Sequence, residues 1–143
     1  MIRDLFIHRD KADVLITYFV NKEFRGKIRN IISTLYQWFY MCVFNTHVLY
    51  LNGPGLYPTE KTRKLNLKSN RNSIHAELHV KLLCSGCSFY EVPGYMQTGL
   101  EGTNSLSWPN FVEVIKMYLW LIYEIKFKKR SFYNKRPIRI IEN

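Results

Sequence analysis

The sequence predicts an α/β fold. Short apolar runs that are typical of buried strands alternate along the chain with longer segments whose apolar residues recur at helical spacing. The composition agrees, because 47% hydrophobic residues provide enough apolar surface for a core in a chain of 143 residues. The predicted order is strand, helix, strand, helix, strand, helix. So few strands cannot complete a free-standing parallel sheet, and we therefore expect an incomplete α/β unit.

The first predicted strand is the apolar run from Asp13 to Tyr18, which a polar and basic connection over residues 21–27 follows. From Ile28 onward the apolar residues fall on one helical face, which predicts a helix of about 15–20 residues. Residues 31–51 contain no Asp, Glu, Lys or Arg. They do contain several hydroxyl and amide side chains, so we expect a buried or interface-packed helix rather than a membrane span.

The middle of the chain begins with a turn signal, Asn52-Gly-Pro-Gly, and a short strand at Leu56-Tyr57. The polar and basic residues 59–72 then predict a short helix followed by a loop. For residues 74–85 the signals conflict. Ser73 as an N-cap and Gly86 as a C′ residue indicate a helix, whereas strict alternation of apolar and polar residues is a strand pattern. We predict a helix here, and the family resemblance described below decides in its favour.

Ser88 to Val92 is the last predicted strand, and a loop over residues 94–107 follows it. A last helix then begins near residues 107–110, where Asn110 and Glu113 have the spacing of a capping box, and ends near Phe127. The basic residues beyond it are expected to be a loosely held tail. The chain is thus divided into a domain at 1–127 and a tail at 128–143.

Charge and cysteine content limit the partners and the compartment. The formal net charge of +10 favours anionic partners, such as phosphates, nucleic acid or an acidic membrane surface. Three cysteines form no disulfide framework, and the sequence begins without the features of an export signal. We therefore expect a reducing, cytoplasmic environment.

A zinc site is one possible interpretation of the residues His75, His79, Cys84 and Cys87, which place four soft ligands within 13 residues. Their order and spacing fit neither the zinc deaminases nor the zinc proteases. We favour a scaffold role for them, and no metal ligand is predicted in this chain.

A second constellation is the group of basic residues that follows the first strand, including Arg25 and Arg29. In α/β sheets, the loops beyond the carboxyl ends of the strands form the ligand crevice. Arginine suits such a place because its planar guanidinium group can bind a diphosphate through two hydrogen bonds.

Residues 73–107 form the most informative unit: a helix carrying Glu77, a stop at Gly86, the sequence Glu91-Val-Pro, and a Gly-rich loop that leads to Ser105. This order resembles the C-terminal half of the catalytic domain of family 2 glycosyltransferases, particularly the polyprenol-phosphate sugar transferases such as dolichol-phosphate mannose synthase. The resemblance covers roughly residues 12–127. It implies the C-terminal part of a GT-A (Rossmann-like) domain that ends in an amphipathic, aromatic helix.

The resemblance assigns a role to Glu77. It corresponds to the carboxylate that faces the acceptor and can act as a general base. With a lipid phosphate as acceptor, whose second pKa is about 6, a base is unnecessary and Glu77 would position the acceptor. The alternative is a solvated helix glutamate next to Lys81 at i+4.

The resemblance also assigns phosphate- or acceptor-binding residues. Arg29 and Ser33 match the spacing of an Arg and a Ser that open the helix beside the phosphates in this family, and Arg25 fits more loosely. Gly102 and Ser105 correspond to the Gly and Ser of the loop that follows Glu-Val-Pro, with one residue more between them.

The implied reaction transfers a sugar from a nucleotide-sugar donor to a lipid-linked or glycan acceptor. In the family, an Asp-x-Asp motif holds a divalent metal, Mg²⁺ or Mn²⁺, against the diphosphate of the donor. Asp4, Asp10 and Asp13 do not form this motif. We therefore expect the donor-binding N-terminal half to be missing, the metal ligands to lie outside this chain, and the chain to be inactive alone.

The aromatic last helix and the basic residues around it suit an anionic leaflet, so the predicted location is the cytoplasmic face of a membrane, as a peripheral protein. The same charges would suit nucleic acid, but no RNA-binding motif or helix-turn-helix signature accompanies them. We expect no nucleic-acid partner. A small basic nucleic-acid-binding protein remains the alternative function, and a zinc protein is a further one.

Overall fold

The computed structural model describes residues 2–21, 26–69, 73–95 and 108–141, and it confirms the predicted α/β class. The elements follow one another as α1 (Ile2–Ile7), β1 (Val14–Phe19), α2 (Lys27–Phe44), β2 (Gly55–Leu56), α3 (Thr59–Arg63), α4 (Ile74–Cys84), β3 (Ser88–Gly94), α5 (Trp108–Ile122), the π-helix η2 (Tyr123–Lys128), α6 (Arg130–Tyr133) and β4 (Ile138–Arg139). The sequence did not predict α1, α6, β4 or the π-helical segment.

A mixed four-stranded sheet with the order β2-β1-β3-β4 forms the base of the fold. β1 and β3 are parallel and pair along their whole length, from Val14 opposite Phe89 to Phe19 opposite Gly94. β2 is antiparallel to β1, and β4 is parallel to β3. The first four residues of β1 are buried without alternation, as expected for a central strand that is covered on both faces.

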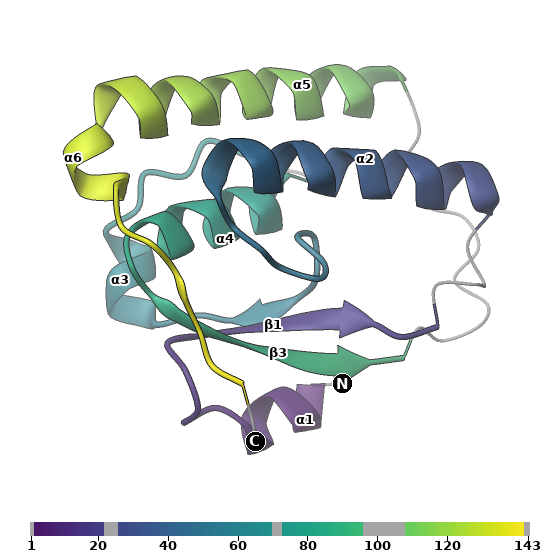
Figure 1. The fold of residues 1–143 in the computed structure, drawn as a ribbon, viewed down its shortest axis with the longest axis vertical. Coiled ribbons are helices and arrows are strands. Elements are labelled where there is room, and N and C mark those ends of the chain that lie inside the picture. The colour runs from purple at the N-terminus through teal and green to yellow at the C-terminus, as the bar shows by residue number, and fades with distance from the viewer. Residues whose placement is uncertain (1, 22–25, 70–72, 96–107, 142–143) are drawn as a thin grey trace.

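The helices cover the two faces of this sheet unequally (Figure 1). α4 and α2 lie over one face with α5 beside α2, whereas the short α1 lies on the opposite face. The main core joins Val14 and Ile16 of β1 to Tyr40 of α2, Val80 of α4 and Leu121 of α5. A much smaller cluster lies beneath α1. Most of the apolar burial is therefore on the side of α2, α4 and α5.

Two glycines bring the segment 53–56 against β1. A Cβ atom on Gly53 would lie 1.9 Å from the carbonyl oxygen of Thr17, and one on Gly55 would lie 2.4 Å from that of Leu15. The backbone N–H of Thr17 also donates to the carbonyl of Pro54, at 2.9 Å. The predicted turn signal therefore also marks a close approach between two backbones.

The predicted helix at 74–85 is confirmed as α4. Ser73 occupies its N-cap position, although its side chain makes no capping hydrogen bond. At the other end Gly86 has φ of 91°, the N–H of Cys87 donates to Leu82 and that of Gly86 donates to Leu83. This pair of bonds is a Schellman motif, the helix end that the glycine predicted.

The expectation of a loosely held tail is wrong. Ile138 and Arg139 pair with Ser88 and Phe89 of β3, and the N–H of Lys135 donates to the carbonyl of Cys84 at 3.1 Å. The predicted capping box is also wrong, because α5 already begins at Trp108 and Asn110 lies within it. None of the helices that the structure describes has the length and hydropathy needed to cross a bilayer.

Candidate functional site

Several elements begin or end at one edge of the sheet, namely the edge formed by the carboxyl ends of its two central strands. Because β1 and β3 are parallel and aligned, both end at this edge, where the N–H of Val20 donates to the carbonyl of Gly94 at 3.1 Å. Figure 1 shows that α2 and α5 begin on the same side of the molecule. Carboxyl ends of strands and amino ends of helices together form the usual place for anionic ligands in α/β folds.

The first turn of α2 carries cationic side chains, and no acidic side chain in the same turn balances their charge. The N-cap is Gly26, no side chain caps the helix, and no acidic residue lies in the first turn, which contains Lys27 and Arg29. The first N–H groups of a helix have no intrahelical acceptor, and the positive end of the helix dipole lies here. Cations at this end are unfavourable by roughly 0.3–1 kcal/mol each, so a bound anion would stabilise the turn.

Two of the predicted phosphate-binding residues lie in the first two turns of α2, on the side of the molecule where β1 and β3 end. Arg29 and Ser33 are half-buried and occupy successive turns at the start of α2. Arg25, Gly102 and Ser105 lie outside the described residues, in the connections that follow β1 and β3. The structure thus places Arg29 and Ser33 near each other at a basic helix N-terminus, and the phosphate-binding roles of all five residues stay predictions.

Glu77 lies inside the molecule, with no exposed surface. Its carboxylate accepts backbone hydrogen bonds from the N–H groups of Lys68 at 3.1 Å and Ser69 at 2.8 Å, and it binds the ammonium group of Lys81 at 2.7 Å. A buried carboxylate with this many donors fixes the preceding loop against α4. An acceptor hydroxyl cannot reach it in this conformation, which differs from the predicted position facing an acceptor.

Lys81 is the centre of a buried ionic cluster formed with Glu77 and Glu124. Its ammonium group binds the Glu124 carboxylate at 2.8 Å and the carbonyl of Asn66 at 2.6 Å. It also lies 4.5 Å from the centre of the Trp120 ring. The sequence suggested the i+4 pair on a solvated surface. The partner Glu124 was missed, although a glutamate with apolar neighbours on both sides, Tyr123 and Ile125, is a signal of this kind.

The residues that were considered as zinc ligands make other contacts in the structure. His79 donates from Nδ1 to the carbonyl of Leu51 at 2.6 Å, and its Nε2 accepts from the hydroxyl of Tyr57 at 3.0 Å. Burial lowers the pKa of His79 to about 4, so the ring is neutral. His75 lies beside the same hydroxyl, whereas Cys84 contacts the carbonyl of Phe44. Over the described ranges, no three His, Cys, Asp or Glu side chains gather as a metal site would require.

Comparisons of the chain with protein-family models, with curated proteins and with solved structures find no significant match.

Proposed function

We propose that this chain is the acceptor side of a GT-A-type glycosyltransferase domain that acts at a membrane surface. The observation that carries the proposal is that β1 and β3 end on the side of the molecule where α2 begins with a basic first turn. The donor-binding half, with its nucleotide sugar, would come from another polypeptide segment.

In this proposal the chain binds the phosphate of a lipid-linked acceptor. Arg29 and the free N–H groups of the first turn of α2 hold the phosphate, and Ser33 contributes a hydroxyl one turn later. Arg25, Gly102 and Ser105 are assigned to the same ligand by the family resemblance. A phosphate acceptor is favoured over a hydroxyl acceptor because Glu77 is buried, and an anionic phosphate oxygen needs no base.

The divalent metal of the proposed reaction has no site in the described part of this chain. Its contribution would be to neutralise charge on the donor diphosphate. Arg29, Ser33 and the other assigned residues of this chain act only on the acceptor, so their roles do not depend on the metal.

A membrane partner is favoured by the outer surface of α2 and α5. Apolar side chains that are 42–73% exposed run along α2, α5 and the following η2. We call this surface the α2–α5 face, and it consists of Ile28, Ile31, Leu35, Trp38 and Phe39 with Phe111, Ile115, Leu119, Tyr123 and Phe127. The two helices pack together, since the Tyr118 hydroxyl donates to the carbonyl of Phe39 at 3.3 Å. An exposed apolar surface of this kind marks a binding surface.

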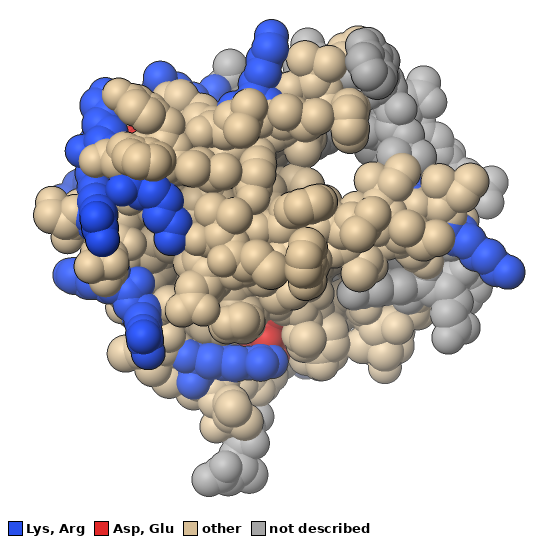
Figure 2. Space-filling model, turned by 45° about the horizontal axis from the view of Figure 1, so that its top comes forward, with Lys and Arg blue, Asp and Glu red and all other residues tan. Residues whose placement is uncertain are grey.

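Basic residues border the α2–α5 face at one end. Figure 2 shows a broad surface without charged residues whose left edge is lined by Lys and Arg. The exposed cations beyond the end of α5 include Lys126, Lys128, Arg130, Lys135 and Arg136. An apolar surface with a cationic border complements an anionic leaflet, whereas nucleic acid would leave the apolar side chains in water.

The acceptor proposal is tested with vesicles that contain a polyprenyl phosphate or, at equal density, the uncharged polyprenol. We expect preferential binding of the phosphate lipid, and about tenfold weaker preference for Arg29→Gln, since a charge-assisted hydrogen bond contributes about 1.5–3 kcal/mol. Arg3→Gln is the matched control, because Arg3 is exposed on α1 at the other face of the sheet. Equal binding of the two lipids by the wild type would contradict the proposal.

Sugar transfer itself is tested by co-expressing the chain with an adjacently encoded segment that carries an Asp-x-Asp motif. Lipid product from labelled nucleotide sugar is expected only when both are present. Binding to DNA or RNA that weakens steeply with salt, without binding to anionic vesicles, would instead identify a nucleic-acid-binding protein.

A further inference from the structure

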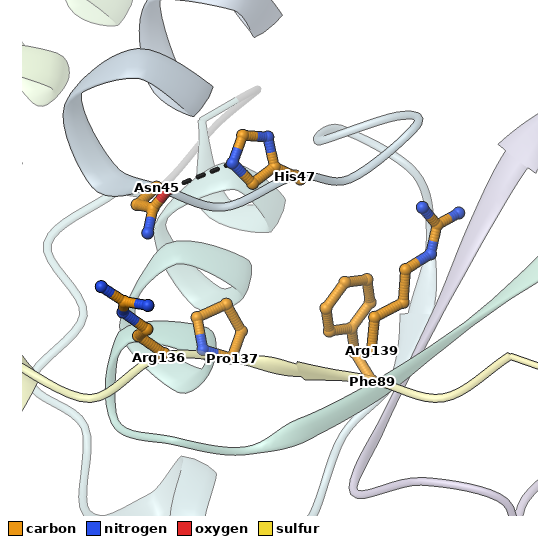
Figure 3. Close-up of a pocket in the computed structure, with 6 residues that line it drawn as sticks. All are labelled: Asn45, His47, Phe89, Arg136, Pro137 and Arg139. Carbon is orange, nitrogen blue, oxygen red and sulfur yellow. Dashed lines mark hydrogen bonds between the residues drawn. The ribbon is translucent and has the colours of Figure 1, made fainter.

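A small pocket lies at the opposite end of the sheet from the proposed acceptor edge (Figure 3). Its volume is about 150 Å³, and its walls come from the exit of α2, the start of β3 and the tail: Asn45, His47, Phe89, Arg136, Pro137 and Arg139. The tail reaches this end because β4 pairs with the first two residues of β3. The pocket is therefore separate from Arg29 and Ser33.

Two hydrogen-bond donors face each other across one side of the pocket. The side-chain oxygen of Asn45 lies 3.0 Å from Nε2 of His47. Because an amide oxygen only accepts, His47 is the donor, and the NH₂ group of Asn45 is left for another partner. Figure 3 shows this NH₂ group directed towards the guanidinium group of Arg136, which can also only donate. An acceptor placed between the two groups would satisfy both.

The two arginines of the pocket differ in their charge balance. Arg139 forms an ion pair with the nearly buried carboxylate of Glu91, which also accepts from the backbone N–H of Leu49. Arg136 is exposed and has no ion-pair partner among the residues that the structure describes. The pocket therefore has a net positive charge, centred on Arg136 and beside the donor group of Asn45.

The pocket also has an apolar part. Phe89 is 2% exposed and, with Pro137, lies between the two arginine side chains. A volume of about 150 Å³ is smaller than the roughly 300–1,000 Å³ of sites for drug-sized ligands. The space suits a small molecule, or one end of a larger one, that combines an anionic group with a flat apolar body.

We propose that this pocket binds a phosphate ester, with the phosphate between Arg136 and the Asn45 amide and the ester group against Phe89 and Pro137. Phosphate fits the donors because the planar guanidinium group binds two phosphate oxygens at once and the amide can bind another. The ester could be a small soluble molecule or a lipid headgroup. The proposal is independent of the acceptor site, since it uses none of the same residues.

The test uses phenyl phosphate as probe, with inorganic phosphate for comparison, and follows binding by the NMR shifts of the His47 ring and the Asn45 side-chain amide. We expect saturable binding of phenyl phosphate, tighter than that of inorganic phosphate. Arg136→Gln should weaken it about tenfold or more, in line with the loss of a charge-assisted hydrogen bond. Arg130→Gln, an equal charge change at an exposed residue outside the pocket, should leave it nearly unchanged.

A second variant, Asn45→Asp, separates the pocket from general charge attraction. Aspartate retains the size of the side chain but places a carboxylate opposite Arg136, so phenyl phosphate binding should be lost while the circular dichroism spectrum is kept. Equal weakening by Arg136→Gln and Arg130→Gln, or no saturable shift of His47 and Asn45, would overturn the proposal. Phosphatidic-acid vesicles identify the source: competition between them and phenyl phosphate indicates a headgroup site, and its absence indicates a soluble ester.

Discussion

The buried ionic cluster and the α2–α5 face reverse the usual distribution of side chains. Glu77, Lys81 and Glu124 are charged and almost completely buried, whereas Leu35 and Trp38 are apolar and more than half exposed. The difference lies in their partners. The charged groups are paired with one another inside the chain, while the apolar groups of α2 and α5 have water on one side.

This comparison separates internal from external roles. A buried charge is tolerated only when it is paired and hydrogen-bonded, so the cluster connects the loop before α4, α4 itself and η2. An apolar surface that remains exposed is explained by a binding partner. Substitutions in the two regions should therefore affect different measurements.

The largest expected effect is a loss of protein stability when the buried ionic cluster is broken. Lys81→Met leaves two buried carboxylates without their shared cation, and the free energy of unfolding should fall by about 3–5 kcal/mol. Urea denaturation measures it. Lys61→Met is the control, because it breaks an exposed pair with Asp13 and should cost at most about 1 kcal/mol. Similar losses of stability in the two variants would show that burial does not determine how much an ion pair contributes.

A smaller loss of stability is expected on acidification, through His79. Burial lowers the pKa of His79 to about 4 in the folded state, so the unfolded chain binds a proton more readily. The stabilisation is complete above the unfolded value of about 6.5 and is lost as pH falls towards 4, by up to roughly 3 kcal/mol. Urea unfolding at about pH 7 and about pH 4.5 should show a larger decrease for the wild type than for His79→Gln. Equal decreases would exclude His79 as the cause.

Substitutions on the α2–α5 face should change vesicle binding instead of stability. Leu35→Ser removes one exposed apolar side chain, so the free energy of unfolding should change by less than about 0.5 kcal/mol. Binding to anionic vesicles should weaken by about tenfold, corresponding to roughly 1.5 kcal/mol of apolar transfer. Ile7→Ser on α1, where the side chain is 64% exposed, is the matched control and should bind normally. Normal binding by Leu35→Ser would remove this face from the membrane contact.

The smallest expected effect concerns the basic border of the same face. Lys128→Gln should reduce binding to anionic vesicles by about 1 kcal/mol at low salt. The difference should shrink at high salt, because screening weakens interactions between exposed charges. Uncharged vesicles should bind both proteins equally. A loss that persists in uncharged vesicles would indicate an effect of packing, not of charge.

The sequence predicted the longer elements because their signals were strong and local. The apolar run of β1, the helical spacing of α2 and the glycine that ends α4 were each sufficient. The alternating pattern in α4 was misleading because residues 76–84 are all buried, so polar residues such as His79 and Lys81 do not mark a solvent face. β4 could not be predicted, since two residues give no periodicity and its pairing with β3 depends on tertiary contacts.

The candidate site was only partly predictable. Arg29 and Ser33 were predicted from the spacing of a family pattern; the structure places them in the first two turns of α2, on the side of the molecule where β1 ends, and their roles stay predictions. The burial of Glu77 was not predictable from the sequence, because it depends on Glu124, which lies 47 positions away along the chain and meets Lys81 only in the folded state. Likewise, the pocket at Arg136 could not be predicted from the sequence, because it forms only where the tail pairs with β3.

The π-helical turn after α5 has a consequence for insertions and deletions in this protein. The N–H of Lys129 donates to the carbonyl of Glu124, five positions back, at 2.8 Å. A π-turn contains one residue more than the α-helix would over the same stretch. Deleting one residue from 125–128 should therefore restore α-helical geometry without turning the chain beyond it, whereas deleting one residue from α5 should rotate that chain by about 100°. The tail would keep its direction only in the first case, so the loss of a single codon is expected to remove both the fourth strand and the pocket it completes when it falls in α5, and to spare them when it falls in 125–128.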